Sequence, residues 1–229
     1  MIDKIKRPYS FEVKVSAAGF QRKDKPVDIE VDFIELLEAA SIEKDAPFSE
    51  NSILVMEYSQ DEVINDNVPF QFEKDKNYDP ENCASGNLVF IMEGETQKDE
   101  TRCFRVLFGT SVDNWESPSF KKQVKLTDNV MDEEQESYKI DTENAVYYYH
   151  KKAGGFSSIL DIEGTDWINH HPGNRAAGEF RGIPNLSHPE GYFHPGPGTE
   201  HGMSRIEAEG PLRLVIYSEA DEGRWACKW

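Results

Sequence analysis

The stretch PVDIEVDF, residues 26–33, indicates how the first half of the chain folds. Val27, Ile29, Val31 and Phe33 are each separated by one acidic residue. Side chains on an extended strand point alternately to opposite faces, so this spacing places the apolar groups on one face and the acids on the other. The pattern predicts a β-strand that is buried on one side and solvated on the other.

The same period of two recurs on both sides of this stretch, and clusters of Asn, Asp, Gly and Pro separate the repeats. Short alternating strands between such turn residues are typical of antiparallel β-sandwiches. A single helical turn is indicated, at IELLEAA (34–40). We expect residues 1–112 to form an immunoglobulin-like sandwich with a structural role. Its further strands are predicted at residues 8–16, 52–58, 87–93 and 102–109.

Composition limits the partners that the chain can have. Its 229 residues carry a net charge of −18, which disfavours nucleic acids and anionic membranes because both require basic side chains. No apolar run is long enough to span a membrane, and the N-terminus has no apolar signal-peptide core. The sequence as given therefore predicts a cytoplasmic protein, or an exported one if a leader was removed. Cys83, Cys103 and Cys227 form no zinc motif.

The chemistry of the sequence changes along the chain. Residues 113–137 are polar and acidic and are predicted to be a linker with one short strand at 123–126. All six histidines follow, at position 150 or later. Residues 138–229 predict a second antiparallel sandwich with a hairpin turn at Glu163-Gly164. Between 169 and 204 lies a His-rich loop, and loops of that length are uncommon unless they are functional.

The stretch VYYYHKKAGGFSSILDIEGTDWI (146–168) resembles the opening hairpin of galactose mutarotase-like sandwich domains. AAGEFRGIPNLSHPEGYFHPG (176–196) resembles a group of bacterial polysaccharide-degrading proteins in which an immunoglobulin-like sandwich precedes the mutarotase-like one. The resemblance implies an all-β fold of two sandwiches, the second one partial. It also implies a polysaccharide or oligosaccharide partner. The late general-base Glu of mutarotases has no counterpart in residues 138–229.

The residue types in the long loop suit sugar chemistry. Imidazoles and carboxylates can transfer protons near neutral pH, and Arg and Asn can bind carboxylates or hydroxyls. A flat aromatic ring can stack on a sugar. The catalytic candidates are His188, His194, Glu179, Glu190 and Tyr192. The substrate-binding candidates are Arg181, Asn185, Trp167, His170 and His171.

Three interpretations of this loop stay open at the level of sequence. It could be a proline-stiffened structural loop, or it could line a saccharide cleft. It could also bind zinc through its histidines, but no regular element carries a ligand pair, so no metal site or cofactor is predicted. For the saccharide cleft, a lyase would use Arg181 and Asn185 on a uronate, and a glycosidase would use two carboxylates such as Glu179 and Glu190. The alternative function is a non-catalytic carbohydrate-binding or structural module.

Overall fold

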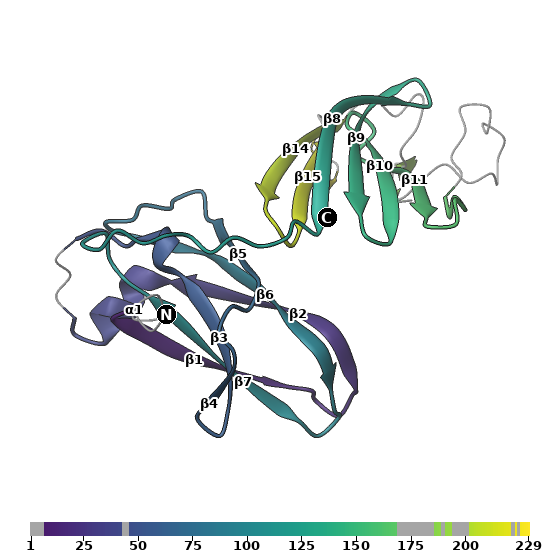
Figure 1. Cartoon of the computed structure of the whole chain (residues 1–229). Coiled ribbons are helices and arrows are strands. Elements are labelled where there is room, and N and C mark those ends of the chain that lie inside the picture. Colours follow the sequence, from purple (N-terminus) through teal and green to yellow (C-terminus); the bar gives the residue numbers. More distant parts are fainter. Residues whose placement is uncertain are drawn as a thin grey trace. The chain divides into compact units, whose positions relative to one another are not determined.

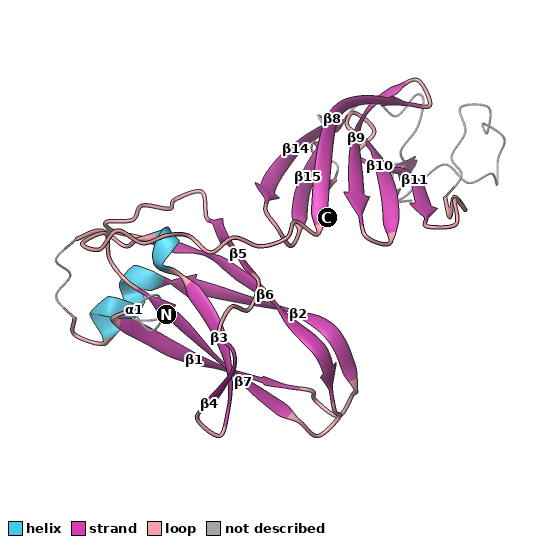
Figure 2. Cartoon of the chain, viewed as in Figure 1, coloured by secondary structure: helices cyan, strands magenta, loops and turns pink. Residues whose placement is uncertain are grey.

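The computed structural model describes residues 7–42, 46–168, 186–188, 191–193, 202–220, 223 and 225–229. Antiparallel strands make up most of this part of the chain, with one α-helix among the described residues (Figure 1 and Figure 2). The chain divides into two compact units, Met1–Lys121 and Lys122–Trp229. The all-β prediction is confirmed, and the sheets of each unit are consistent with a β-sandwich.

The first unit contains two antiparallel sheets, with strand orders β1-β7-β3-β4 and β2-β6-β5. Val106 of β7 and Phe90 of β6 belong to the same buried cluster, so both sheets contribute to one core. This shared core explains the alternating pattern, because each strand buries only the face directed at the other sheet. The strands are β1 (Tyr9–Ser16), β2 (Arg22–Asp32), β3 (Leu54–Ser59), β4 (Glu62–Asn65), β5 (Phe70–Lys74), β6 (Ser85–Thr96) and β7 (Thr101–Phe108).

Helix α1 (Phe33–Ala39) directly follows β2, where the sequence predicted a helical turn. The Asp32 carboxylate caps it by accepting hydrogen bonds from the backbone N–H groups of Ile34 at 2.8 Å and Glu35 at 3.4 Å. Phe33 and Leu37, four residues apart, are buried and anchor the helix on the core. Phe33 thus belongs to the helix, although the alternation placed it at the end of a strand. A 3-10 turn, η2 (Glu50–Ser52), precedes β3.

A buried ion pair lies inside the first unit. Both guanidinium nitrogens of Arg102 that face Glu57 lie 2.6 Å from its carboxylate oxygens. Arg102 also donates to the backbone carbonyl of Glu93 and to the hydroxyl of Thr96. Full pairing of this kind is required for charges removed from water, and it explains how a charged pair is tolerated beside the apolar core.

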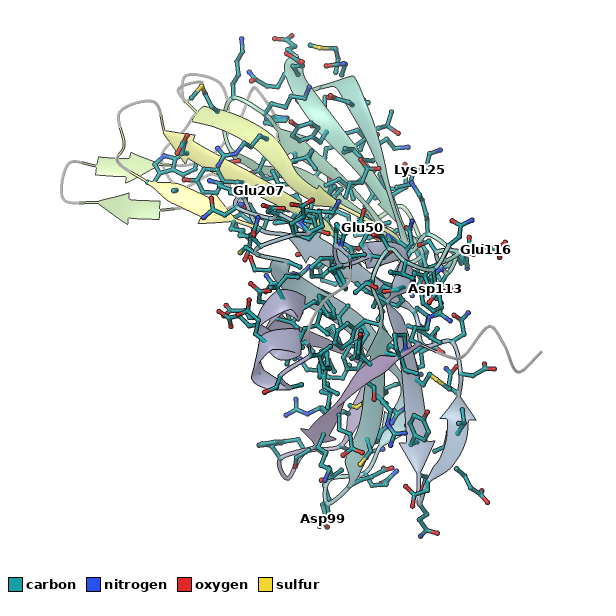
Figure 3. All side chains as sticks on the ribbon, turned by 90° about the vertical axis from the view of Figure 1, so that its left-hand side faces the viewer. Glu50, Asp99, Asp113, Glu116, Lys125 and Glu207 are labelled. Carbon is teal, nitrogen blue, oxygen red and sulfur yellow. The ribbon has the colours of Figure 1, made fainter. Side chains whose placement is uncertain are left out.

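Acidic side chains extend from the turns of the first unit and from the connecting segment. Asp99 lies at the tip of the β6–β7 turn, and Asp113 and Glu116 lie in the connection after β7 (Figure 3). All three are exposed. These three carboxylates are therefore hydrated by solvent.

The described residues of the second unit form two larger antiparallel sheets, with strand orders β11-β10-β9-β8 and β14-β15-β16. Tyr149 of β10 and Ile216 of β15 belong to one buried cluster, so these sheets share a core as well. A separate hairpin pairs β12 with β13. The strands are β8 (Val124–Asp132), β9 (Gln135–Thr142), β10 (Ala145–His150), β11 (Gly155–Asp161), β12 (Leu186–His188), β13 (Gly191–Phe193), β14 (Gly202–Glu209), β15 (Leu214–Ala220) and β16 (Ala226–Lys228).

The predicted linker, residues 113–137, extends too far. In the structure the segment without strands ends before β8, which begins at Val124. The predicted range contains β8 and the first residues of β9, which pair with each other in the second unit. The period of two is interrupted inside β8 because the register shifts between Thr127 and Val130, and Asn129 has a positive φ of 55°. Such a bulge moves the following side chains to the opposite face, so the strand resembled polar linker sequence.

Strand β5 begins directly after Pro69, because a proline at the start of a strand removes no ladder hydrogen bond. One further expectation needs correction. Residues 169–204 were expected to lack regular structure, yet their described parts contain β12, β13 and the start of β14. The predicted turn at Glu163-Gly164 is present, although a single bridge, Leu160 to Asp166, joins its two sides.

Candidate functional site

Most of the predicted site lies outside the described residues. This applies to Glu179, Glu190, His194, Arg181, Asn185, His170 and His171. His188 and Tyr192 lie on β12 and β13, in a hairpin that pairs Ser187 with Tyr192 and His188 with Gly191, but their side chains are not described. Trp167 is the predicted site residue whose side chain can be placed.

Trp167 is exposed and is held by a specific contact. Its side chain is 74% exposed, and its indole N–H donates a 2.9 Å hydrogen bond to Oδ2 of Asp161. The other carboxylate oxygen of Asp161 accepts from the backbone N–H groups of Glu163 and Thr165, each at 2.9 Å. The hydrogen bond from Trp167, followed by those from the turn, lowers the pKa of Asp161. The ring edge is thereby fixed, and much of the ring surface stays accessible.

Asp166 fixes the backbone on which Trp167 stands. Its Oδ2 accepts a 2.6 Å hydrogen bond from the Ser158 hydroxyl. Its Oδ1 accepts from the backbone N–H groups of Ile159 at 3.1 Å and Ile168 at 3.0 Å. Two aspartates, one on each side of Gly164, therefore hold the return segment against β11. Gly164 itself has a φ of +83°, a conformation that favours glycine.

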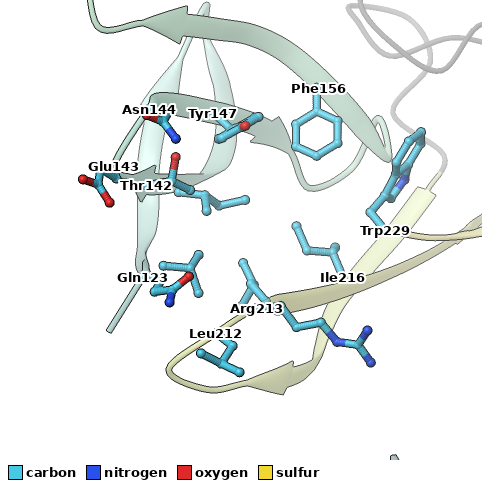
Figure 4. Close-up of a pocket in the computed structure, with 13 residues that line it drawn as sticks. Gln123, Thr142, Glu143, Asn144, Tyr147, Phe156, Leu212, Arg213, Ile216 and Trp229 are labelled. Carbon is cyan, nitrogen blue, oxygen red and sulfur yellow. The ribbon is translucent and has the colours of Figure 1, made fainter. Parts of the chain in front are cut away.

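A pocket of about 380 Å³ lies between the two sheets of the second unit. Gln123, directly before β8, and polar residues at the end of β9 and in the β9–β10 turn lie at one end. Phe156 and Trp229 lie at the other end, with Tyr147 between them (Figure 4). Ile216 and Leu214 of β15 form the opposing apolar wall. A pocket with an apolar body and a few polar groups at one end is the usual form of a small-ligand site. The polar or charged lining residues are Gln123, Thr142, Glu143, Asn144 and Arg213.

The local fold explains why this pocket stays open. The backbone N–H of Gln123 donates to the carbonyl of Pro211 at 2.7 Å, which fastens the start of β8 to the β14–β15 turn. At the opposite end, the backbone of Trp229 exchanges two hydrogen bonds with Ile216, at 2.9 and 3.0 Å. The Trp229 ring contacts the edge of Phe156 at a centroid distance of 5.4 Å and is 40% exposed. The two sheets are thus held together at both ends of the pocket.

A cluster of Ser, His and Asp lies elsewhere in the first sheet of this unit, but its geometry differs from that of a hydrolytic triad. Nε2 of His150 lies 2.9 Å from Oδ2 of Asp132, and the Ser157 hydroxyl donates to the same oxygen at 2.6 Å. In a triad the serine would donate to the imidazole. Here both groups bind the carboxylate, and the His150 side chain is fully buried. The cluster joins β8, β10 and β11.

The electrostatics of Asp132 agree with a structural role. Burial raises the pKa of its carboxyl, but the hydrogen bonds from His150 and Ser157 lower it by more, so the net pKa lies below the ordinary value. Asp132 is consequently an ionised acceptor at neutral pH. A carboxylate in this state is not a proton donor for catalysis.

Buried hydroxyls connect the two sheets of the second unit. The Tyr149 hydroxyl lies 2.6 Å from that of Ser218, which lies 2.6 Å from that of Ser204. Burial raises the pKa of Tyr149 to about 12. Tyr147 and Tyr149 share one face of β10, as expected, and both pack in the core. Tyr147 additionally lines the pocket, a role that sequence reasoning missed because strand packing alone accounts for its spacing.

Other classes of site find no support in the described part of the chain. No group of three or more His, Cys, Asp or Glu residues there could hold a metal ion. Cys103 and Cys227 lie on β7 and β16, and burial raises the pKa of Cys227, which disfavours the reactive thiolate. No helix within the described ranges is long and apolar enough to cross a membrane.

Comparison with known proteins yields no relative. No family model matches the chain, and neither the curated proteins nor the solved structures contain a significant match. Trp167 and the pocket of the second unit are therefore the described features that point to a function.

Proposed function

We propose that this chain is a carbohydrate-active protein whose second unit binds an oligosaccharide or polysaccharide. The observation that carries the proposal is the exposed Trp167 ring held by Asp161. The π-face of an indole is electron-rich and attracts the C–H groups on the apolar face of a sugar ring. A ring whose orientation is already fixed loses little conformational freedom on binding, which favours affinity.

The pocket supports the same ligand class. Its apolar body matches the C–H faces of sugars, and the amides of Gln123 and Asn144 offer both donors and acceptors for hydroxyls. The net charge of −18 disfavours phosphate-rich ligands.

We also propose that the first unit is an immunoglobulin-like sandwich and that the second is a partial galactose mutarotase-like sandwich. The order of the two β units supports it, as does the Gly-Gly-x-Ser-Ser motif, whose second Gly begins β11. The assignment predicts a bacterial polysaccharide-degrading context.

Binding is the part of the function that the described geometry supports best. Catalytic turnover, by a lyase or a glycosidase mechanism, stays a prediction. Its candidate catalytic residues are Glu179, His188, Glu190, Tyr192 and His194. A non-catalytic binding module is the alternative, and product formation distinguishes the two.

A glycan array probed with the full chain tests the proposal. Trp167→Ala should abolish or strongly weaken the signal that the unaltered protein gives. Phe20→Ala is the matched control, because Phe20 is 68% exposed but lies in the first unit. Absence of binding to every glycan, or equal binding by the unaltered protein and Trp167→Ala, would contradict the proposal. Assays for new reducing ends and for unsaturated products, run on the bound glycans, separate glycosidase from lyase.

A further inference from the structure

We infer that the ligand is an extended, uncharged oligosaccharide that runs across the strands of sheet β11-β10-β9-β8, from the pocket to Trp167. This inference rests on the proposed function and adds the length, direction and charge of the ligand. It follows from the strand register, which connects two features that are far apart in the sequence.

The register places Trp167 on the face of the sheet that lines the pocket. Its backbone N–H donates to the carbonyl of Ile159 at 2.9 Å, beside the bridge between Leu160 and Asp166. Ile159 pairs with Tyr147, and Tyr147 pairs with Ile140. Side chains of paired residues point to the same face of a sheet. Because Tyr147 and Ile140 line the pocket, this row of side chains continues from the pocket to Trp167.

The contact between Trp167 and Asp161 supports this placement independently. Asp161 is two residues beyond Ile159 and pairs with Ala145, two residues before Tyr147. It therefore points to the same face as both residues. Since the Asp161 carboxylate binds the indole N–H, the Trp167 ring lies over that face as well.

The spacing of the row requires more than one sugar. Thr142 of β9, at the polar end of the pocket, lies three strand positions from Trp167, across β10 and β11. Neighbouring strands are about 4.8 Å apart, so these two backbones are separated by about 14 Å. A monosaccharide held at the polar end would not reach the Trp167 ring. A short chain of pyranose rings would, with one end among the polar residues of the β9–β10 turn.

The lining also indicates the charge of the ligand. Gln123, Thr142 and Asn144 are neutral, and the pocket lining holds one acid, Glu143, and one base, Arg213. A chain of uronates would bring several carboxylates to a protein that already carries a large negative charge. Neutral hydroxyls match the amide and hydroxyl groups without that repulsion. Of the two turnover mechanisms, an uncharged ligand is compatible with a glycosidase and not with a lyase that acts on uronates.

Calorimetric titration of the full chain with neutral gluco-, manno- and galacto-oligosaccharide ladders, from monosaccharide to hexasaccharide, tests the inference. An oligogalacturonide ladder serves as the charged comparison. Affinity should rise with length for one neutral ladder and then level off. Trp167→Ala should remove this gain, about tenfold or more as for a well-packed aromatic contact, and leave the monosaccharide unaffected. Asn144→Ala, at the polar end, should weaken every length.

The remaining outcomes distinguish failure of the extended ligand from failure of carbohydrate binding. Affinity independent of length, or equal loss for monosaccharide and hexasaccharide in Trp167→Ala, overturns the extended ligand but leaves carbohydrate binding intact. Preference for the galacturonide ladder overturns the uncharged ligand. Failure of all ladders and of the glycan array overturns the proposed function itself. Thermal melting of both variants confirms that they are folded, and Phe20→Ala is again the control.

Discussion

The Asp161 carboxylate has two structural roles. One oxygen accepts a hydrogen bond from the Trp167 indole, and the other accepts hydrogen bonds from the backbone of the turn that carries Trp167. The turn and the ring orientation are therefore set by one side chain. This relationship allows the two roles to be separated by mutation.

Asp161→Asn should loosen the Trp167 ring while keeping the turn. An asparagine oxygen in the place of Oδ1 still accepts from Glu163 and Thr165, but the amide nitrogen in the place of Oδ2 cannot accept from the indole. We expect several-fold weaker binding of long oligosaccharides and an unchanged melting transition. Calorimetry on the neutral ladder measures the first effect. Binding equal to that of the unaltered protein would show that the hydrogen bond does not position the ring.

Arg102→Met should destabilise the protein by about 3 kcal/mol or more, because it leaves Glu57 charged without its partner in the interior. Arg105→Met is the matched control. Its ion pair with Glu12 lies at the surface, where such pairs contribute at most about 1 kcal/mol. Urea unfolding of both variants measures the difference, and similar midpoints would contradict a buried role for Arg102.

Asp132→Asn should destabilise the second unit by about 2 kcal/mol at neutral pH, since it weakens the hydrogen bonds from His150 and Ser157. The folded-state pKa of Asp132 is lowered, so its contribution is present above the unfolded pKa of about 3.9 and disappears as the pH falls through the folded value. The difference between the two proteins should shrink in acid. A difference that is constant from pH 7 to pH 3 would contradict this account.

Tyr149→Phe should cost about 1 kcal/mol at neutral pH, because Ser218 loses one of its two hydroxyl partners. Burial raises the folded pKa of Tyr149 to about 12. The stability that the neutral phenol contributes is therefore lost as the pH rises from about 10 to about 12. Unfolding curves across this range should show a smaller alkaline loss for Tyr149→Phe than for the unaltered protein.

His188→Ala and His194→Ala should each reduce turnover of the true substrate by about a hundredfold or more, the usual contribution of a general acid or base. Folding should be unchanged in both. A product assay and a melting curve on the same preparation test this. Loss of folding would instead identify these histidines as structural, and full activity would remove them from the mechanism.

The strands were predictable from sequence where alternation is regular, as in β2 and β7, because each buries one face against a shared core. At β8 (Val124–Asp132) only the first part was predicted, as a short strand at 123–126, because the bulge at Asn129 breaks the period beyond it. Trp167 was selected from the sequence because a flat aromatic ring beside the long loop can stack on a sugar. The hydrogen bond that holds its ring to Asp161 depends on the geometry of the turn between them, which could not be predicted from the sequence.

The pocket could not have been predicted from sequence. Its walls come from the start of β8, the β9–β10 turn, β15 and Trp229. These segments are far apart in the sequence, and only the order and facing of the two sheets bring them together. Each lining residue also has an ordinary local explanation, such as Tyr147 as a strand residue that packs in the core.

The most direct test of sugar binding at Trp167 is a ¹⁵N–¹H correlation spectrum of the indole N–H groups during titration with a glycan that the array identifies. The chain has four tryptophans, so Trp167→Ala assigns the relevant peak by its loss. We predict that the Trp167 peak shifts and saturates with the dissociation constant measured by calorimetry. A Trp167 peak that stays in place while the glycan binds would contradict the account.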